Sequence, residues 1–347
     1  MRWSFDRYRL QFGFLARTSR AAMTYKDTYL LHATAADGRT ATAECPLFAG
    51  LSAEDDPGYE CRLDALCRAL GADGLTDADM RGLLDAADSS ARFGVESALD
   101  LLADAGRPPR TLVYDINGLV WMGDKETMAA RIRSKLREGF RCIKLKIGGI
   151  SFDDELDLLA LIRRQFGPAD LELRLDANGA FTAANVMERL ERLAQFNVHS
   201  IEQPVRAGQH TLMARVCAES PIPVALDEEL IGVTPQPVME QMLGYIRPSY
   251  VILKPALCGG FGAADGWIAA ARANGVGWWA TSALESNIGL AAIARWLDRY
   301  TVTMPQGLGT GELFTNNIGA GVHRHGSRII VHTAPDLTGQ SEKSGKS

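Results

Sequence analysis

The stretch RCIKLKIG, residues 141–148, places two lysines inside an apolar run that is typical of a strand buried on both faces. Side chains alternate along a strand, so Lys144 and Lys146 point to the same side. A fully buried lysine is uncommon unless a partner holds it. The rest of the sequence must therefore supply groups that face these two lysines.

The stretch belongs to a long segment in which short apolar runs alternate with helical patterns, whose starts include candidate N-caps at Asp124 and Ser151. The candidate strands are residues 111–119, 141–148, 171–179, 198–204, 222–229, 249–255, 276–286 and 300–304. Strands that alternate with helices in this way predict an α/β protein with a (β/α) barrel. An open doubly wound sheet is the alternative.

The two ends of the chain have different patterns. Residues 1–110 combine hairpin and helical patterns and predict an α+β domain. We expect the barrel to span residues 111–304 and the Gly-rich segment 305–335, with one further strand, to return to the N-terminal domain. Residues 336–347 have the composition of a disordered tail.

The composition is that of an ordinary globular protein, with 46% hydrophobic and 23% charged residues. A net charge of −5, with acids and bases interspersed, indicates neither a nucleic-acid nor an anionic-membrane partner. The six cysteines form no CxxC pair, and the sequence shows neither a signal segment nor a membrane span. We expect a cytoplasmic protein; its oligomeric state stays open, a homo-oligomer included.

Three carboxylates end consecutive candidate strands: Asp176, Glu202 and Asp227. They are 26 and 25 residues apart, about one β/α unit each, so a barrel would place them side by side at its C-terminal rim. Such carboxylates repel one another unless a cation lies between them. Oxygen ligands favour Mg²⁺, and Mn²⁺ is also compatible with them.

Lys254 follows Asp227 by 27 residues and ends the sixth candidate strand. Strands two and six lie opposite each other in an eight-stranded barrel, so a substrate above the acids would have a lysine on each face. A single strand-end aspartate is usually a helix N-cap, and a single strand lysine can protect a sheet edge. The regular spacing of all these groups favours an active site instead.

These motifs resemble the muconate-lactonizing subgroup of the enolase superfamily. The matching pieces are KLK (144–146), DAN (176–178), EQP (202–204), DE (227–228), LKP (253–255) with GG (259–260), AECPLFAGLS (43–52) and SARFGVESALDLL (90–102). The resemblance implies a (β/α)7β TIM-like barrel under an α+β capping domain that both chain ends form. It also implies Mg²⁺ ligands at Asp176, Glu202 and Asp227, and a proton abstraction α to a carboxylate between Lys146 and Lys254.

A lysine base is a known device of this superfamily. Lys144 is the neighbouring positive charge that would help Lys146 act as the base.

Within the subgroup, SALESNIGL (282–290) and GLGTGELF (307–314) resemble the o-succinylbenzoate synthase family. The resemblance implies a hydro-lyase of menaquinone biosynthesis, a carbon–oxygen lyase that needs Mg²⁺. Its reaction is the syn-dehydration of 2-succinyl-6-hydroxy-2,4-cyclohexadiene-1-carboxylate to 2-succinylbenzoate through an enediolate. The residues we expect to contact this small carboxylate substrate are Arg20, Leu119, Ser282, Glu285, Ser286, Asn287, Gly309 and Thr310.

Other activities remain as alternatives. The segment MPQGLGTGELFTNN (304–317) lacks the Asp-x-Asp that dipeptide epimerases carry, which disfavours dipeptide substrates. An N-succinylamino acid racemase and a muconate-type cycloisomerase are the enzymatic alternatives. A catalytically dead barrel that acts as a binding module is the alternative outside enzymes, and the stability cost of clustered ionisable groups disfavours it.

Overall fold

A computed structural model describes residues 1–17, 22–84 and 88–333 of the chain. The N-terminal part is an antiparallel sheet with helices packed against it. Its elements are β1 (Arg2–Arg17), β2 (Ala22–Thr34), β3 (Thr40–Cys45), α1 (Tyr59–Leu70), α2 (Asp77–Gly82) and α3 (Ser89–Asp104). The sheet order β1-β2-β3 confirms the predicted hairpins. We call this part the cap.

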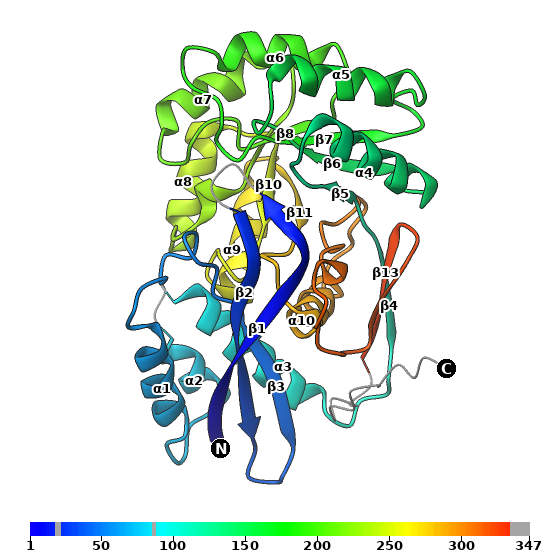
Figure 1. The fold of residues 1–347 in the computed structure, drawn as a ribbon. Helices are drawn as coiled ribbons and strands as arrows, with labels where there is room; N and C mark the ends of the chain where they lie inside the picture. The colour runs from blue at the N-terminus through cyan, green and yellow to red at the C-terminus, as the bar shows by residue number, and fades with distance from the viewer. Residues whose placement is uncertain (18–21, 85–87, 334–347) are drawn as a thin grey trace, which may run out of the picture.

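The central part is a parallel sheet of seven strands in the order β11-β10-β9-β8-β7-β6-β5. The strands are β5 (Gly118–Val120), β6 (Cys142–Lys146), β7 (Glu172–Asp176), β8 (Ser200–Glu202), β9 (Val224–Leu226), β10 (Tyr250–Leu253) and β11 (Gly277–Ala280). The helices are α4 (Lys125–Arg137), α5 (Phe152–Arg163), α6 (Val186–Ala194), α7 (His210–Glu219), α8 (Gln236–Ile246), α9 (Gly260–Ala273) and α10 (Asn287–Leu297), with the 3-10 turns η1 (Glu228–Leu230) and η2 (Gly311–Leu313). Figure 1 shows the helices around this sheet and the cap below it.

Two N-caps predicted from the sequence are confirmed. The Asp124 side chain accepts a hydrogen bond from the backbone N–H of Thr127 at the start of α4. Ser151 caps α5 in the same way, by accepting from the N–H of Asp154. These caps fix where the helices begin, and therefore how far each strand runs before its loop.

The first and last predicted barrel strands need correction. β4 (Thr111–Asp115) leaves the barrel and forms a separate antiparallel sheet with β13 (Arg328–His332) and β12 (Val322–His325). The first barrel strand is the short β5 instead. Residues 300–304 form no strand, although they lie within the described part of the chain.

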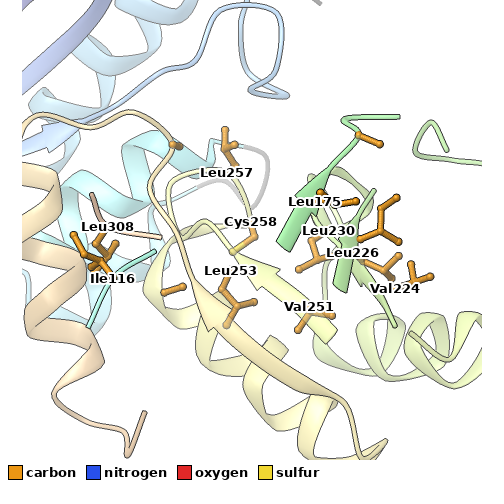
Figure 2. Close-up of a cluster of buried hydrophobic side chains, with 14 of the residues drawn as sticks. Ile116, Leu175, Val224, Leu226, Leu230, Val251, Leu253, Leu257, Cys258 and Leu308 are labelled. Atoms are coloured by element: carbon orange, nitrogen blue, oxygen red, sulfur yellow. The ribbon is translucent and has the colours of Figure 1, made fainter. Parts of the chain in front are cut away.

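Residues 306–307 occupy the eighth position of the barrel. Gln306 bridges in parallel to Ile116, and Gly307 bridges in parallel to Thr281, at the end of β11. The Gln306 side chain also accepts a hydrogen bond from the N–H of Ala280 at 2.8 Å. Leu308, the next residue, packs with Ile116 in the main hydrophobic cluster, as Figure 2 shows. The predicted TIM-like barrel fold is thus confirmed, with its closure made by bridges rather than by a full strand.

The cap is joined to the barrel by buried carboxylates. Glu44 of β3 accepts hydrogen bonds from the N–H groups of Ser286 and Gly289 at the start of α10. Glu96 of α3 accepts from the N–H groups of Phe261 and Gly262 at the start of α9. A helix N-terminus favours such negative charges, so the two carboxylates fix the cap on the barrel.

The C-terminal segment contacts both parts of the molecule. Phe314 bridges to Phe12 of β1, with ring centroids 4.8 Å apart. Asn316 accepts from the N–H of Gln11 at 2.7 Å and donates to the carbonyl of Arg9 at 2.8 Å. The segment therefore supports β1 before the chain turns into β12. The proposed domain boundaries remain a prediction. No helix in the described ranges is long and apolar enough to cross a membrane.

Candidate active site

The three predicted acidic residues lie at the carboxyl ends of adjacent strands. Asp176 ends β7 and Glu202 ends β8, and the two residues are register partners in the parallel sheet. Asp227 directly follows β9, the next strand. All three side chains are buried, at 0–3% relative exposure. The strand spacing in the sequence thus brought three carboxylates to one rim.

The three lysines are paired with these acids. The Lys144 ammonium lies 2.9 Å from Asp176 Oδ2 and 2.5 Å from Glu202 Oε2, so it joins two of the carboxylates. Lys146 Nζ donates to Asp176 Oδ2 at 2.8 Å and to Asn178 Oδ1 at 2.7 Å. Lys254, which follows β10, pairs with Asp227.

β6 and β10 take the second and sixth places when residues 306–307 take the eighth. Lys146 and Lys254 therefore approach the barrel mouth from opposite sides.

Burial and charge compete at these groups. Burial alone would lower the pKa of Lys144, but the surrounding carboxylates raise it. Burial also acts against the charged form of Asp176, yet Lys144 and Lys146 hold its pKa below the ordinary value. The pKa of Glu202 is raised well above its usual range, by burial and then by the neighbouring charge of Asp176. Burial is therefore unfavourable for the charged form of Glu202, even though lysines lie beside the three carboxylates.

A cavity of about 980 Å³ opens above this rim, between the cap and the barrel. Its lining includes eight of the predicted site residues: Leu119, Lys144, Lys146, Asp176, Lys254, Ser282, Gly309 and Thr310. The cap contributes residues 22–27 of β2 and residues 47–51. Figure 1 shows the β1–β2 hairpin reaching from the cap toward β10 and β11. The cavity has the size of a small-molecule site.

The structure places three predicted substrate contacts outside the cavity lining. Glu285 and Ser286 are fully buried, and Ser286 donates to Glu44 as it caps α10. The N–H of Asn287 donates to the side chain of Asn317. Ser286 and Asn287 thus join the cap and the C-terminal segment to the barrel, and substrate contact by the three residues stays a prediction. Arg20, also expected to contact the substrate, lies outside the described residues.

The cavity lining also contains polar residues that were not predicted as site residues, among them Asn178, Asn117 and Lys26. Asn178 lies within the DAN motif, and its positive φ of 43° turns the chain so that its side chain accepts from Lys146. Asn117 has a buried Oδ1 without a hydrogen-bond partner. Lys26 comes from the cap. The motif could have indicated Asn178, whereas the other two depend on how distant segments pack.

The acidic rim presents three carboxylates as candidate ligands of a divalent metal ion. No three acidic, histidine or cysteine side chains of the described residues are grouped closely enough to hold a metal ion. Lysine ammonium groups pair with the three carboxylates instead. The donor chemistry nevertheless fits a hard cation, because all three side chains offer oxygen. Glu202 Oε1 is also buried without a hydrogen-bond partner, an atom that a cation would satisfy.

Comparisons with known proteins give a consistent result. The family model described as "Enolase C-terminal domain-like" matches residues 127–312. The o-succinylbenzoate synthase of Desulfotalea psychrophila is 45% identical, over 92% of this chain and 95% of that protein. The N-succinylamino acid racemase of Thermus thermophilus is 33% identical, over 46% of this chain and 41% of that protein.

Solved structures agree with the fold. The crystal structure of MenC from Desulfotalea psychrophila superposes with a TM-score of 0.80 and 41% identity, and the match covers 95% of this chain and 99% of that one. The L-Ala-D/L-Glu epimerase of Bacillus subtilis has a TM-score of 0.84, with 95% of each chain covered, but only 20% identity. The second likeness therefore shows the fold alone.

Proposed function

This chain belongs to the enolase superfamily and, within it, to the o-succinylbenzoate synthase family, and from that premise we propose how its residues carry out the dehydration. The substrate would be 2-succinyl-6-hydroxy-2,4-cyclohexadiene-1-carboxylate, and the product 2-succinylbenzoate. The observation that supports this activity most strongly is the 45% identity to an o-succinylbenzoate synthase over nearly the whole of both proteins.

Lys146 is the proposed base and acid. Its Nζ would take the proton α to the ring carboxylate and return it to the departing hydroxyl on the same face, so that the hydroxyl leaves as water. Asn178 and Asp176 hold this ammonium group in place, at 2.7 and 2.8 Å. A proton carrier positioned in this way typically accelerates a reaction by about 10²–10⁴-fold.

Lys254 is the proposed stabiliser on the opposite face. Its charge would lie beside the negative charge that develops on the ring carboxylate as the proton leaves. Burial opposes the charged form of Lys254, but Asp227 and Glu202 raise its pKa, which favours the charged form. A positive charge at this place suits a stabilising role in the dehydration.

Asp176, Glu202 and Asp227 would hold the Mg²⁺ ion, with Mn²⁺ as a substitute. The ion would supply a fixed positive charge that stabilises the carboxylate of the substrate as its α-proton is removed. The residues of the chain position these oxygens through the β7–β8 register and exclude water by burial under the cap.

The activity can be tested with the purified full-length chain and three substrate classes. With Mg²⁺, we expect rapid dehydration of the cyclohexadiene carboxylate, slower racemisation of N-succinyl amino acids, and slower turnover of dipeptides. A chelator should abolish dehydration, and added Mg²⁺ should restore it. Faster turnover of dipeptides than of both other classes would contradict the proposed substrate, and activity that survives chelation would contradict the metal.

A further inference from the structure

Glu228 is a buried acid of the cavity lining that the proposed chemistry does not yet use. It begins η1, directly after Asp227, and has a relative exposure of 7%. Its Oε1 accepts a hydrogen bond from Asn178 Nδ2 at 3.1 Å. Asn178 Oδ1 in turn accepts from Lys146 Nζ at 2.7 Å. The three side chains therefore form a chain of hydrogen bonds from the turn after β9 to the proposed base.

This chain allows the amide of Asn178 only one orientation. A carboxylate can only accept hydrogen bonds, and an ammonium group can only donate them. The amide between them must therefore turn its nitrogen toward Glu228 and its oxygen toward Lys146. In the opposite orientation, its N–H groups would face the ammonium and its oxygen would face the carboxylate. Glu228 thus determines which end of the amide Lys146 meets.

The backbone brings Asn178 to this position. Its φ of 43° lies in the left-handed region, which asparagine and aspartate adopt more readily than most residues. Its N–H also donates to Asp176 Oδ1 at 3.0 Å, which fixes the turn that follows β7. In the sheet, β8 lies between β7 and β9. The hydrogen bond to Glu228 therefore joins the ends of two strands that are not adjacent.

The other partner of Lys146 is shared with further cations. Asp176 Oδ2 accepts from Lys146 at 2.8 Å and lies 2.9 Å from the Lys144 ammonium. Asp176 is also a proposed ligand of the metal ion. A carboxylate that several cations share is a weaker acceptor for each of them. The direction of the Lys146 ammonium then depends on the oxygen of Asn178.

We propose that Glu228 is a positioning residue for Lys146, which acts by fixing the amide of Asn178. The inference rests on the proposed function, in which Lys146 carries the proton. Glu228 itself exchanges no proton with the substrate in this role. Without its carboxylate, a rotated amide would repel the ammonium and displace the proton carrier from the substrate, and small displacements of a catalytic group reduce the rate strongly.

The first test replaces the carboxylate by an amide of the same size. Glu228→Gln can donate as well as accept, so it no longer fixes the orientation of Asn178. We expect kcat for dehydration to fall by about 10- to 100-fold at saturating Mg²⁺. KM should stay within about threefold, because the interaction acts on the proton transfer rather than on binding. Glu54→Gln, at a buried acid of the cap, is the matched control and should lower Tm without changing kcat.

The second test exchanges donor and acceptor, because Glu228→Gln also removes a charge near Lys254. Burial lowers the pKa of Lys254, and the charges of Asp227, Glu202 and Glu228 raise it. Asn178→Asp alone suits the left-handed backbone but places two carboxylates together, so kcat should fall. The double variant Asn178→Asp/Glu228→Gln reverses the hydrogen bond, keeps the net charge of the pair and still offers an oxygen to Lys146. We expect its kcat to exceed that of both single variants and to lie within about tenfold of the wild type.

Calorimetric titration with Mg²⁺ and thermal unfolding accompany the kinetics of all variants. The Mg²⁺ affinity of the double variant should match that of the wild type. If the double variant loses the product of the two single losses, or if more Mg²⁺ restores Glu228→Gln, Glu228 does not act through Asn178 and the inference is overturned. If Glu228→Gln fails to fold, Asn178→Asp and the double variant still decide. A wild-type enzyme that cannot dehydrate the cyclohexadiene carboxylate would instead overturn the proposed function, and this inference with it.

Discussion

Lys146 and Lys254 are the same type of residue at equivalent places in the barrel, yet their surroundings differ. Lys146 donates to both Asp176 and Asn178, whereas Lys254 pairs with Asp227. In Lys146→Ala, the proposed proton carrier is absent, so kcat for dehydration should fall by about 10²–10⁴-fold. Calorimetric binding of 2-succinylbenzoate should persist, and Lys125→Ala should retain full activity.

Isotope exchange separates the two lysines further. Each enantiomer of an N-succinyl amino acid presents its α-proton to a different face of the site. In deuterated water, Lys146→Ala should still exchange the α-proton of one enantiomer, with Lys254 as the acceptor, for any such substrate that the wild type exchanges. Exchange of both enantiomers by this variant, followed by NMR, would show that Lys146 is not the base on its face.

Glu285 is a buried acid whose pKa is raised to about 7, mainly by burial. Between its pKa in the unfolded chain and pH 7, the folded state holds a proton that the unfolded state has lost. The contribution of Glu285 to stability is therefore present below about pH 4.5 and is lost as pH rises through 7. Glu285→Gln, which mimics the protonated acid, should be neutral at pH 5 and stabilise the protein by roughly 1–3 kcal/mol at pH 8.

Thermal unfolding at the two pH values checks this expectation. The exposed Glu191→Gln on α6 serves as the control, and its effect should not change with pH. If Glu285→Gln shifts Tm equally at pH 5 and pH 8, the raised pKa is not present in the folded protein.

The residues that strand periodicity could predict are those whose positions depend on the strand alone. Asp176, Glu202 and Lys254 each end or follow a strand, so one β/α interval placed them at the same rim. Glu285 and Ser286 lie in a motif that also suggests substrate contact; both are buried, and Ser286 donates to Glu44 of the cap. Burial by a distant segment cannot be inferred from the local sequence pattern. For the same reason, the position of Lys26 in the cavity lining was not predicted.

At the scale of single elements, barrel closure depends on a glycine. A Cβ atom on Gly307 would lie 2.0 Å from Thr281 Oγ1 and 2.5 Å from Thr281 Cβ. Gly307→Ala should therefore force the two segments apart and destabilise the protein by about 1–3 kcal/mol, as overpacking does. Chemical denaturation measures this, and Gly319→Ala is a matched control because nothing lies within 4 Å of its Cβ. Equal stability of the two variants would contradict the tight closure.

The terminal strands of the barrel were the elements that the sequence did not predict correctly. The pattern in residues 111–119 is continuous, but the chain divides it between β4 and β5, which belong to different sheets. Residues 300–304 have the β-branched and apolar character of a strand, yet closure occurs at Gln306 and Gly307. The strand propensity of residues 300–304 was outweighed by the geometry of barrel closure. The last position of the barrel must pair with the first strand on one side and with the seventh strand on the other.

At the scale of the whole molecule, Glu44 holds the cap against the barrel, whereas Glu54 acts within the cap, where it accepts from Ser90. Both are buried glutamates, so Glu44→Gln and Glu54→Gln should each cost about 1–3 kcal/mol of stability. Only Glu44→Gln should also raise KM, because it loosens the cap that covers the cavity. Steady-state kinetics and thermal unfolding distinguish the two effects, and an equal rise of KM in both variants would contradict a docking role.

The C-terminal contact with β1 also affects how the protein is made. Asn316 binds Arg9 and Gln11 across about 305 positions of the chain. At ordinary translation rates, the first strand leaves the ribosome roughly 15–60 s before the residues that support it. During that interval, the nascent cap has neither Phe314 nor the barrel beneath it. A truncated mRNA that ends before the codons for Phe314 and Asn316 would therefore yield a chain that contains every proposed catalytic residue but lacks the contacts that support β1 over the site.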